Sequence, residues 1–297
     1  MSDRSLRGVI AAISTPLDSR GEPDIERLLG HASYLLDNGC DGLNLLGTTG
    51  EATSFSVAQR QLVMQSVARS DLSLQRFMVG TGAASVADAV ALTSEAAALG
   101  FAGALVLPPF YYKPVTHEGI VGYIGALADA TAQSDIPLYL YNFPALSGVP
   151  YTPDLVALLL KRFGHRIAGL KDSSGDLAYA RTVAALSPSL DVFPSNEATL
   201  LEARAGTFAG CISATANLNS NDCGLAFRTG DEAALARAVA VRAIFDGLPL
   251  VPGIKHVIAA RLGDPSWAMT VPPLTSLRAD EAATIERRHA TIERVPA

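Results

Sequence analysis

Residues 136–144 read IPLYLYNFP, and residues 167–176 read IAGLKDSSGD. In each segment a short apolar run ends on one chemically useful side chain, Tyr141 or Lys171, just before a loop. A third run, LNLL at 43–46, leads into a glycine-rich turn, GTTGE, at 47–51. Continuous apolar runs without strict alternation are typical of strands that are buried on both faces of a parallel sheet.

Similar runs alternate with helical patterns along almost the whole chain. The predicted strands are Gly8–Ser14, Gly42–Leu46, Phe77–Gly80, Gly103–Leu107, Leu138–Tyr141, Ile167–Lys171, Asp191–Phe193 and Gly210–Ser213. Eight strand–helix units in about 225 residues predict an α/β fold, the (β/α)8 TIM barrel. A doubly wound sheet is the alternative, but no GxGxxG motif follows the first strand.

The helices between these strands have readable ends. Ser56 and Gln59 have capping-box spacing, and Thr152 precedes a proline at the first helical position. Asn38-Gly39 and Leu99-Gly100 indicate helix ends. Helical patterns also follow the eighth unit, around 232–245, 253–261 and 279–292. We therefore predict a barrel domain over residues 1–225 and a small C-terminal α-helical extension over 226–297.

The composition narrows the class of protein. Of the 297 residues, 49% are hydrophobic and 18% are charged, which is enough for a large core. A net charge of −6 without a basic cluster argues against nucleic-acid binding. Three cysteines, Cys40, Cys211 and Cys223, lack CxxC spacing and suggest buried thiols. The polar start, Met1 to Arg7, and the lack of a ~20-residue apolar span lead us to expect a cytoplasmic protein that does not bind membranes.

The strand-end residues suit imine chemistry on a small keto acid, although each has a simpler reading. A lone lysine at a strand end is most often a solvated residue, and Tyr141 could be an ordinary core tyrosine. To act as a nucleophile, Lys171 must lose its proton, and burial in an apolar barrel mouth favours that loss. In the 47–51 turn, backbone N–H groups could bind a carboxylate, or the turn could merely connect two elements.

Five motifs in order resemble the dihydrodipicolinate synthase/N-acetylneuraminate lyase family. They are LGTTGE at 46–51, PFYY at 109–112, YNFP at 141–144, GLKDSSGD at 169–176 and GCISATAN at 210–217. The resemblance runs from about Arg7 to Leu274. It implies a barrel with a helical extension, class I aldol chemistry on pyruvate or another small 2-keto acid with an aldehyde partner, and a homotetramer built as a dimer of dimers. It implies no metal and no organic cofactor.

The resemblance also implies catalytic roles for four residues. Lys171 would form the Schiff base with the keto carbon, and Tyr141 would act as the acid/base. Thr48 matches the hydroxyl that relays protons. Tyr111 matches a tyrosine that members commonly insert into the site of a neighbouring subunit; an aromatic packing residue in the loop after the fourth strand is the alternative.

Substrate binding is implied at further positions. Thr49, Gly47 and their backbone match the carboxylate-binding turn, and the backbone carbonyl of Ile212 would lie near bound pyruvate. Contacts with the substrate tail are expected from three residues on strand-end loops, Ser173, Asn196 and Glu197. For Asn196 and Glu197, a helix cap followed by a first-turn acid is an equally good reading.

One departure from the pattern bears on the substrate. The synthases of this family carry an arginine two residues after the proline of YNxP, where it binds the aldehyde's carboxylate, but this chain has Leu146 there. Leucine cannot form that bidentate contact. We therefore predict a Schiff-base lyase acting on a 2-keto-3-deoxy sugar acid. The alternatives are a 4-hydroxy-tetrahydrodipicolinate synthase in which another cation replaces the arginine, and a non-catalytic keto-acid binding protein.

Overall fold

Eight parallel strands form the centre of the molecule. The computed structural model describes residues 6–293; the predictions for the first five and last four residues lie outside this range. The strands are β1 (Gly8–Ala12), β2 (Gly42–Leu45), β3 (Phe77–Gly80), β4 (Gly103–Val106), β5 (Leu138–Asn142), β6 (Ile167–Asp172), β7 (Asp191–Pro194) and β8 (Gly210–Ser213). Their order is β7-β6-β5-β4-β3-β2-β1-β8, and Ala209 donates to the carbonyl of Val192 at 2.9 Å across the remaining gap. The predicted (β/α)8 barrel is confirmed.

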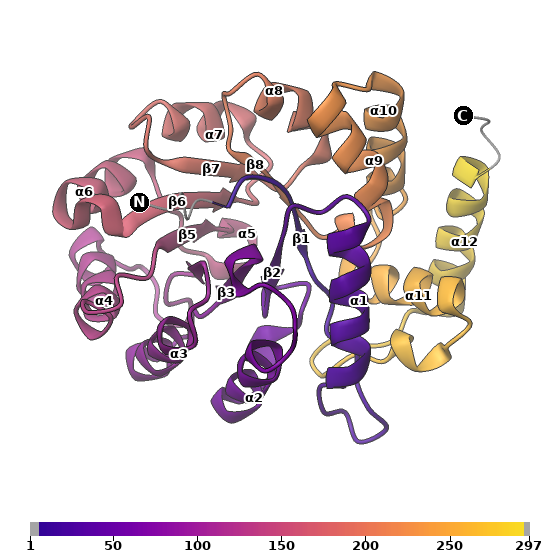
Figure 1. Cartoon of the computed structure of the whole chain (residues 1–297), viewed down its shortest axis with the longest axis horizontal. Coiled ribbons are helices and arrows are strands. Elements are labelled where there is room, and N and C mark those ends of the chain that lie inside the picture. The colour runs from indigo at the N-terminus through magenta and orange to yellow at the C-terminus, as the bar shows by residue number, and fades with distance from the viewer. Residues whose placement is uncertain (1–5, 294–297) are drawn as a thin grey trace.

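Helices surround this barrel, and the last ones stand to its side beyond α1 (Figure 1). They are α1 (Ile25–Asp37), α2 (Val57–Ala68), α3 (Val86–Leu99), α4 (His117–Ala130), α5 (Pro144–Ser147), α6 (Pro153–Phe163), α7 (Leu177–Ala184), α8 (Leu200–Arg204), α9 (Ala216–Thr229), α10 (Glu232–Ala243), α11 (Leu250–Leu262) and α12 (Ala279–Glu293). The boundary predicted between residues 225 and 226 falls within α9, between its kink at Asn219 and its end at Gly230. The division into a barrel domain and a helical extension stays a prediction.

The predicted helix ends are confirmed at the level of single hydrogen bonds. At α2, the Ser56 hydroxyl accepts from the N–H of Gln59, and the Gln59 side chain accepts from the N–H of Ser56. Thr152 caps α6 in front of Pro153. Gly100 ends α3 with φ of 88°, a left-handed conformation that favours glycine.

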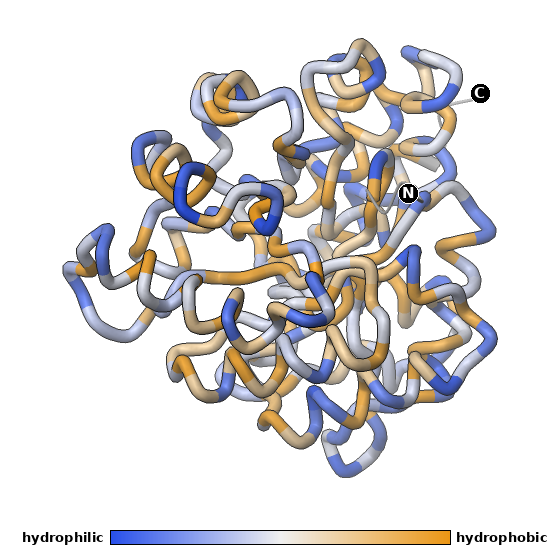
Figure 2. The backbone as a smooth tube through the Cα atoms, turned by 60° about the vertical axis from the view of Figure 1, so that its left-hand side comes forward, coloured by the Kyte–Doolittle hydropathy of each residue, from blue (hydrophilic) through white to orange (hydrophobic). Residues whose placement is uncertain are grey.

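Three hydrophobic clusters correspond to three layers of the molecule. Alternate residues of β1 illustrate the first two: Ile10 packs in the barrel interior, whereas Val9 and Ala11 pack between strands and helices. The third cluster, which includes Phe245, Ile254 and Trp267, lies within the C-terminal extension. Hydrophobic segments accordingly run through the interior, and hydrophilic residues gather at the peripheral bends (Figure 2).

A large aromatic ring fills the lower barrel interior. Tyr139 of β5 is fully buried, and glycines face it from both neighbouring strands. A Cβ on Gly103 or Gly169 would lie 2.6 Å from a carbon of the Tyr139 ring, closer than packing permits. The barrel is therefore a filled core, and open space begins only above it at the carboxyl ends of the strands.

Candidate active site

The ends of β5 and β6 bring Tyr141 and Lys171 side by side. The two residues are register partners in the parallel pair, and both side chains are 4% exposed. The Lys171 amine lies 4.3 Å from the centroid of the Tyr141 ring. Among the residues that the structure describes, none forms an ion pair with Lys171. The sequence prediction that neighbouring strand ends bring amine and phenol together is confirmed.

Side-chain hydrogen bonds connect the ends of β5 and β6. The Asn142 amide donates to the Asp172 carboxylate at 2.7 Å, and its oxygen accepts from the N–H of Tyr151 at 3.0 Å. Asp172 also accepts from the N–H and hydroxyl of Ser174. Burial raises the pKa of Asp172, while these hydrogen bonds oppose the shift. The residues immediately after Tyr141 and Lys171 are thus held rigidly, and the two preceding side chains are positioned with them.

The turn after β2 adds a hydroxyl group to the pair. The Thr48 hydroxyl lies 3.2 Å from the Tyr141 hydroxyl, within hydrogen-bond distance. Thr49 is buried beside it, and Gly47 is buried beneath, where a Cβ would meet the Asn44 side chain at 2.5 Å. Lysine, tyrosine and threonine thus come together from three strand ends.

These groups open into a cavity of about 470 Å³ at the carboxyl face of the barrel. Of the predicted site residues, those that line it are Thr48, Thr49, Tyr141, Lys171, Ser173 and Ile212. Apolar side chains form much of the remaining wall, including Leu146, which is 62% exposed at the rim. The dimensions suit a small molecule that is held over Lys171.

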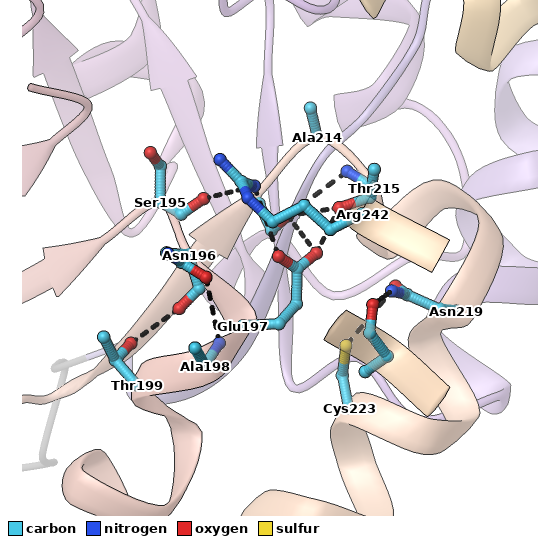
Figure 3. Close-up of polar contacts among 12 residues, drawn as sticks. Ser195, Asn196, Glu197, Ala198, Thr199, Ala214, Thr215, Asn219, Cys223 and Arg242 are labelled. Carbon is cyan, nitrogen blue, oxygen red and sulfur yellow. Dashed lines mark hydrogen bonds and ion pairs between the residues drawn. The ribbon is translucent and has the colours of Figure 1, made fainter. Parts of the chain in front are cut away.

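Glu197 and Asn196 do not line this cavity, contrary to the expected contacts with a substrate tail. Glu197 is fully buried, and its carboxylate accepts hydrogen bonds from Ser213 and Thr215 (Figure 3). The Asn196 side chain caps the short helix at 197–199 by accepting from the N–H of Ala198. The helix-cap interpretation of this pair fits the structure. The Asn196 side chain bonds to the backbone of its own loop, and the Glu197 side chain bonds to buried hydroxyl groups, so neither faces the cavity.

Comparison with known proteins places the chain in a family. The model of the dihydrodipicolinate synthetase family matches residues 5–288. The chain belongs to that family. An uncharacterized DapA-like lyase from Chloroflexus aurantiacus is 36% identical over 96% of this chain and 97% of its own. A 4-hydroxy-tetrahydrodipicolinate synthase from Synechococcus sp. is 31% identical over 96% of this chain and 94% of its own.

Solved structures of family members agree with the fold. The dihydrodipicolinate synthase of Agrobacterium tumefaciens has a TM-score of 0.90 at 26% identity, covering 97% of this chain and 99% of its own. A prophage protein of the family from E. coli K12, solved in complex with pyruvate, has a TM-score of 0.86 at 25% identity, with 97% and 98% covered. The chain is thus a lyase of the dihydrodipicolinate synthetase family, as its sequence motifs predicted.

The tyrosine implied by family resemblance to act between subunits lies apart from the other three catalytic candidates. Tyr111 follows β4 in an exposed loop, with 76% of its surface accessible, and packs edge-on against Tyr112 at 5.2 Å. Two large exposed aromatic side chains in one loop are unusual on a free surface. Within its own chain Tyr111 does not line the cavity.

Several residues that line the cavity were not predicted from the sequence. Ser195, one residue before Asn196, lines the cavity and could have been found as the first polar residue after β7. Arg242 of α10 and the wall formed by Pro249, Val251 and Leu274 come from the C-terminal extension. No local pattern marked these residues, since their role depends on how the extension folds over the barrel mouth.

The cysteines agree with the prediction from the sequence. Cys40, Cys211 and Cys223 are free and buried, as predicted. Burial raises the pKa of Cys40 to about 12, so its thiol stays protonated and unreactive at neutral pH. Within residues 6–293, none of the helices combines the length and apolar character that a bilayer crossing requires.

Proposed function

We propose that this lyase forms a Schiff base between Lys171 and pyruvate and catalyses reversible aldol cleavage of a 2-keto-3-deoxy sugar acid. The observation that carries the proposal is the buried Lys171 amine, 4.3 Å from the centroid of the Tyr141 ring, with the Tyr141 hydroxyl next to Thr48. A protein that only bound a keto acid would not need a buried amine next to the Tyr141 and Thr48 hydroxyl groups. A non-catalytic binding protein is therefore the weaker alternative.

The chemistry follows from these groups. The neutral amine of Lys171 attacks the C2 carbonyl carbon, and loss of water leaves an imine. Once protonated, the imine draws electrons from the neighbouring carbon, so the C3–C4 bond breaks and leaves an enamine. The hydroxyl proton at C4 leaves through Tyr141 as the aldehyde forms, and Thr48 relays it. Protonation of the enamine and hydrolysis then release pyruvate, and condensation is the reverse.

Backbone groups of the 47–51 turn are proposed to hold the carboxylate of the keto acid. Thr48 and Thr49 line the cavity from the turn after β2, and Ile212 lines it from β8. A carboxylate anchored by the N–H groups of this turn would keep the keto carbon within reach of Lys171. Ser173, on the loop after β6, would contact the substrate tail.

The assembly and location are proposed from the same family membership. Tyr111 and Tyr112 expose large aromatic surfaces, which supports a homotetramer in which Tyr111 completes the site of a neighbouring subunit. Three buried free thiols suit a reducing compartment such as the cytoplasm. Sedimentation velocity of the wild type and of Tyr111→Phe would test the assembly, and loss of activity in an intact Tyr111→Phe tetramer would support the role of the hydroxyl.

Borohydride trapping tests the central proposal. Incubation with pyruvate and borohydride should add a reduced pyruvate adduct to the peptide that contains Lys171, as measured by intact mass and peptide mapping. Lys171→Ala should show no adduct, whereas Lys161→Ala, an exposed lysine on α6, should trap like wild type. An unmodified wild-type protein, or an adduct on another lysine, would refute the proposal.

A substrate panel separates the remaining alternatives. Cleavage of 2-keto-3-deoxy sugar acids is followed by pyruvate release, and condensation of pyruvate with aspartate semialdehyde is followed in parallel. We expect kcat/KM to be greater for the sugar acids, because Leu146 stands at the position where the synthases carry the arginine that binds the aldehyde's carboxylate. A strong preference for aspartate semialdehyde would instead establish the synthase alternative.

A further inference from the structure

The cavity contains one cation besides Lys171, and it comes from an unexpected direction. Arg242 is the only other lysine or arginine among the described lining residues. It is located in the last turn of α10, in the C-terminal extension, and its side chain is 33% exposed. The position at which the synthases carry arginine holds Leu146 at the rim. The cavity therefore retains a cation, but on a different wall.

The surrounding contacts hold the Arg242 guanidinium in one place. Its Nη1 donates to the carbonyl of Ser195 at 2.7 Å and to the Glu197 carboxylate at 3.2 Å (Figure 3). Both hydrogen bonds that this guanidinium forms with the described part of the chain use Nη1. Because arginine has five N–H donors in a rigid fork, donors remain for a ligand on the cavity side.

The buried acid beneath Arg242 is already well satisfied. Glu197 accepts from the Ser213 hydroxyl at 2.5 Å and from Thr215, as well as from Arg242. Glu197 is fully buried, whereas Arg242 is partly exposed. The carboxylate thus lies on the interior side of the guanidinium, and the opposite side faces the cavity. Because Glu197 already holds the Arg242 side chain in place, little further side-chain entropy would be lost when the guanidinium binds an anion.

The distance from Lys171 suits a short substrate. Lys171 pairs with Phe193 across β6 and β7, and Ser195 lies two residues further along β7's direction. With strands ~4.8 Å apart and a rise of ~3.3 Å per residue, the Cα atoms of Lys171 and Ser195 are on the order of 8 Å apart. Because Arg242 donates to the Ser195 carbonyl and all three residues line one cavity, a substrate bound to Lys171 at one end could reach the guanidinium with its other end.

We infer that Arg242 binds a terminal anionic group of the aldehyde fragment, so that the substrate is a short 2-keto acid with a second anion at its far end. This inference rests on the proposed function and narrows its substrate class. A carboxylate and a phosphate offer the same recognition chemistry to a guanidinium. Arg242 would thus determine specificity from the extension, in place of the strand-end arginine of the synthases.

The test compares aldehydes that differ in charge. Condensation with pyruvate is measured for succinic semialdehyde against butanal, and for glyceraldehyde 3-phosphate against glyceraldehyde. Wild type should prefer the anionic member of at least one pair, and that pair identifies carboxylate or phosphate. In Arg242→Gln, kcat/KM for the preferred anionic aldehyde should fall roughly 10- to 100-fold, mainly because KM rises. A loss of that size corresponds to one charge-assisted hydrogen bond. The uncharged member should change by less than about threefold.

Two further variants make the outcome decisive. Arg237→Gln is the matched control, because Arg237 lies on the same helix and pairs with Asp222 away from the cavity; it should leave both aldehydes unaffected. Arg242→Lys keeps the charge and should retain part of the anion preference even if Arg242→Gln folds poorly. Equal losses for both members of a pair, or no preference in wild type, would overturn the inference. Borohydride trapping of pyruvate in wild type separates that result from failure of the proposed function, which would leave no adduct.

Discussion

At the scale of single residues, the proposed chemistry depends on the contacts among the Lys171 amine, the Tyr141 phenol and the Thr48 hydroxyl. Among residues 6–293, the Tyr141 hydroxyl has one hydrogen-bond partner, Thr48, and its ring contacts the Lys171 amine. A phenol in this position can exchange protons with a substrate while Thr48 replenishes them. The proposed role of Tyr141 in proton transfer can therefore be separated from its contribution to the cavity wall by removing the hydroxyl oxygen alone.

Replacing Tyr141 by phenylalanine should preserve imine formation and slow turnover. Lys171 keeps its aromatic neighbour, so pyruvate should still be trapped by borohydride. Loss of the acid/base should lower kcat by about 10²- to 10⁴-fold, the usual contribution of a positioned proton donor. Steady-state pyruvate release measures this, with Tyr112→Phe as a control in the exposed loop. Near-normal kcat in Tyr141→Phe would remove Tyr141 from the mechanism.

His31 of α1 is a second residue whose protonation is set by its surroundings. Burial lowers the pKa of His31 to about 4. Its Nε2 lies 2.9 Å from Oδ1 of Asn217. The Asn217 amide nitrogen already donates to the carbonyls of Ala12 and Ala214, so Oδ1 accepts and the neutral imidazole donates. His31 in its uncharged form thus joins α1 to the first turn of α9.

This arrangement predicts a loss of stability in acid. The unfolded chain protonates His31 near pH 6.5 and the folded chain only near pH 4, so the unfolded state binds more protons between these values. The free energy of unfolding should therefore fall as the pH decreases, by up to about 3 kcal/mol from this residue. Urea denaturation at pH 7, 5.5 and 4.5 measures the fall. His31→Gln, which can still donate to Asn217, should show a smaller one, and identical pH profiles would contradict this account.

At the scale of elements, rigid strand ends position the site. Tyr141 and Lys171 precede Asn142 and Asp172, whose side chains join β5 to β6. The sequence predicted both strands and their neighbouring order, because apolar runs and the parallel topology are readable locally. The Asn142–Asp172 bond and the short helix α5 after β5 were not predicted, since neither depends on a periodic pattern. The sequence therefore predicted the strands correctly but did not predict the side-chain hydrogen bond that joins them.

Removing the link should affect both stability and turnover. Asn142→Ala leaves the Asp172 carboxylate and the N–H of Tyr151 without this partner in a buried setting. The cost should be about 1–3 kcal/mol for each unsatisfied group. Urea denaturation should show this loss, and kcat should fall because the preceding side chains lose their support. Asn38→Ala, which removes a solvent-exposed hydrogen bond to the carbonyl of Tyr34, is the control and should cost well under that amount.

At the scale of the whole molecule, the C-terminal extension is bound to the 47–51 turn. Lys255 of α11 is fully buried and binds Glu51, the last residue of the 47–51 turn, together with the carbonyl of Met269 at 2.8 Å. The other oxygen of Glu51 accepts from the N–H of Val271 at 2.7 Å. Burial lowers the pKa of Lys255, and the Glu51 carboxylate opposes that shift. The extension thereby fixes the turn that carries Thr48.

Breaking this pair should destabilise the protein strongly. Lys255→Met leaves the Glu51 carboxylate buried without its cation, which should cost about 3–5 kcal/mol. Adding Glu51→Gln removes the stranded charge while keeping an acceptor for Val271, so the double variant should recover much of that loss. Thermal and urea unfolding measure both. The control is His256→Gln, also on α11, which removes a more exposed pair with Glu286 of α12. It should stay within about 0.5 kcal/mol of wild type. Similar losses in Lys255→Met and His256→Gln would contradict this interpretation.

The sequence by itself determined the barrel and the three strand-end groups Lys171, Tyr141 and Thr48. Each of these follows from a local apolar run and from the rule that parallel strands end on one face. Only the tertiary structure decided that Glu197 lies inside the protein and that Arg242 lines the cavity. It also decided that Lys255 holds Glu51, 204 positions away in the chain. Such contacts join segments that no local periodicity relates, so burial and charge pairing in the folded chain set their roles.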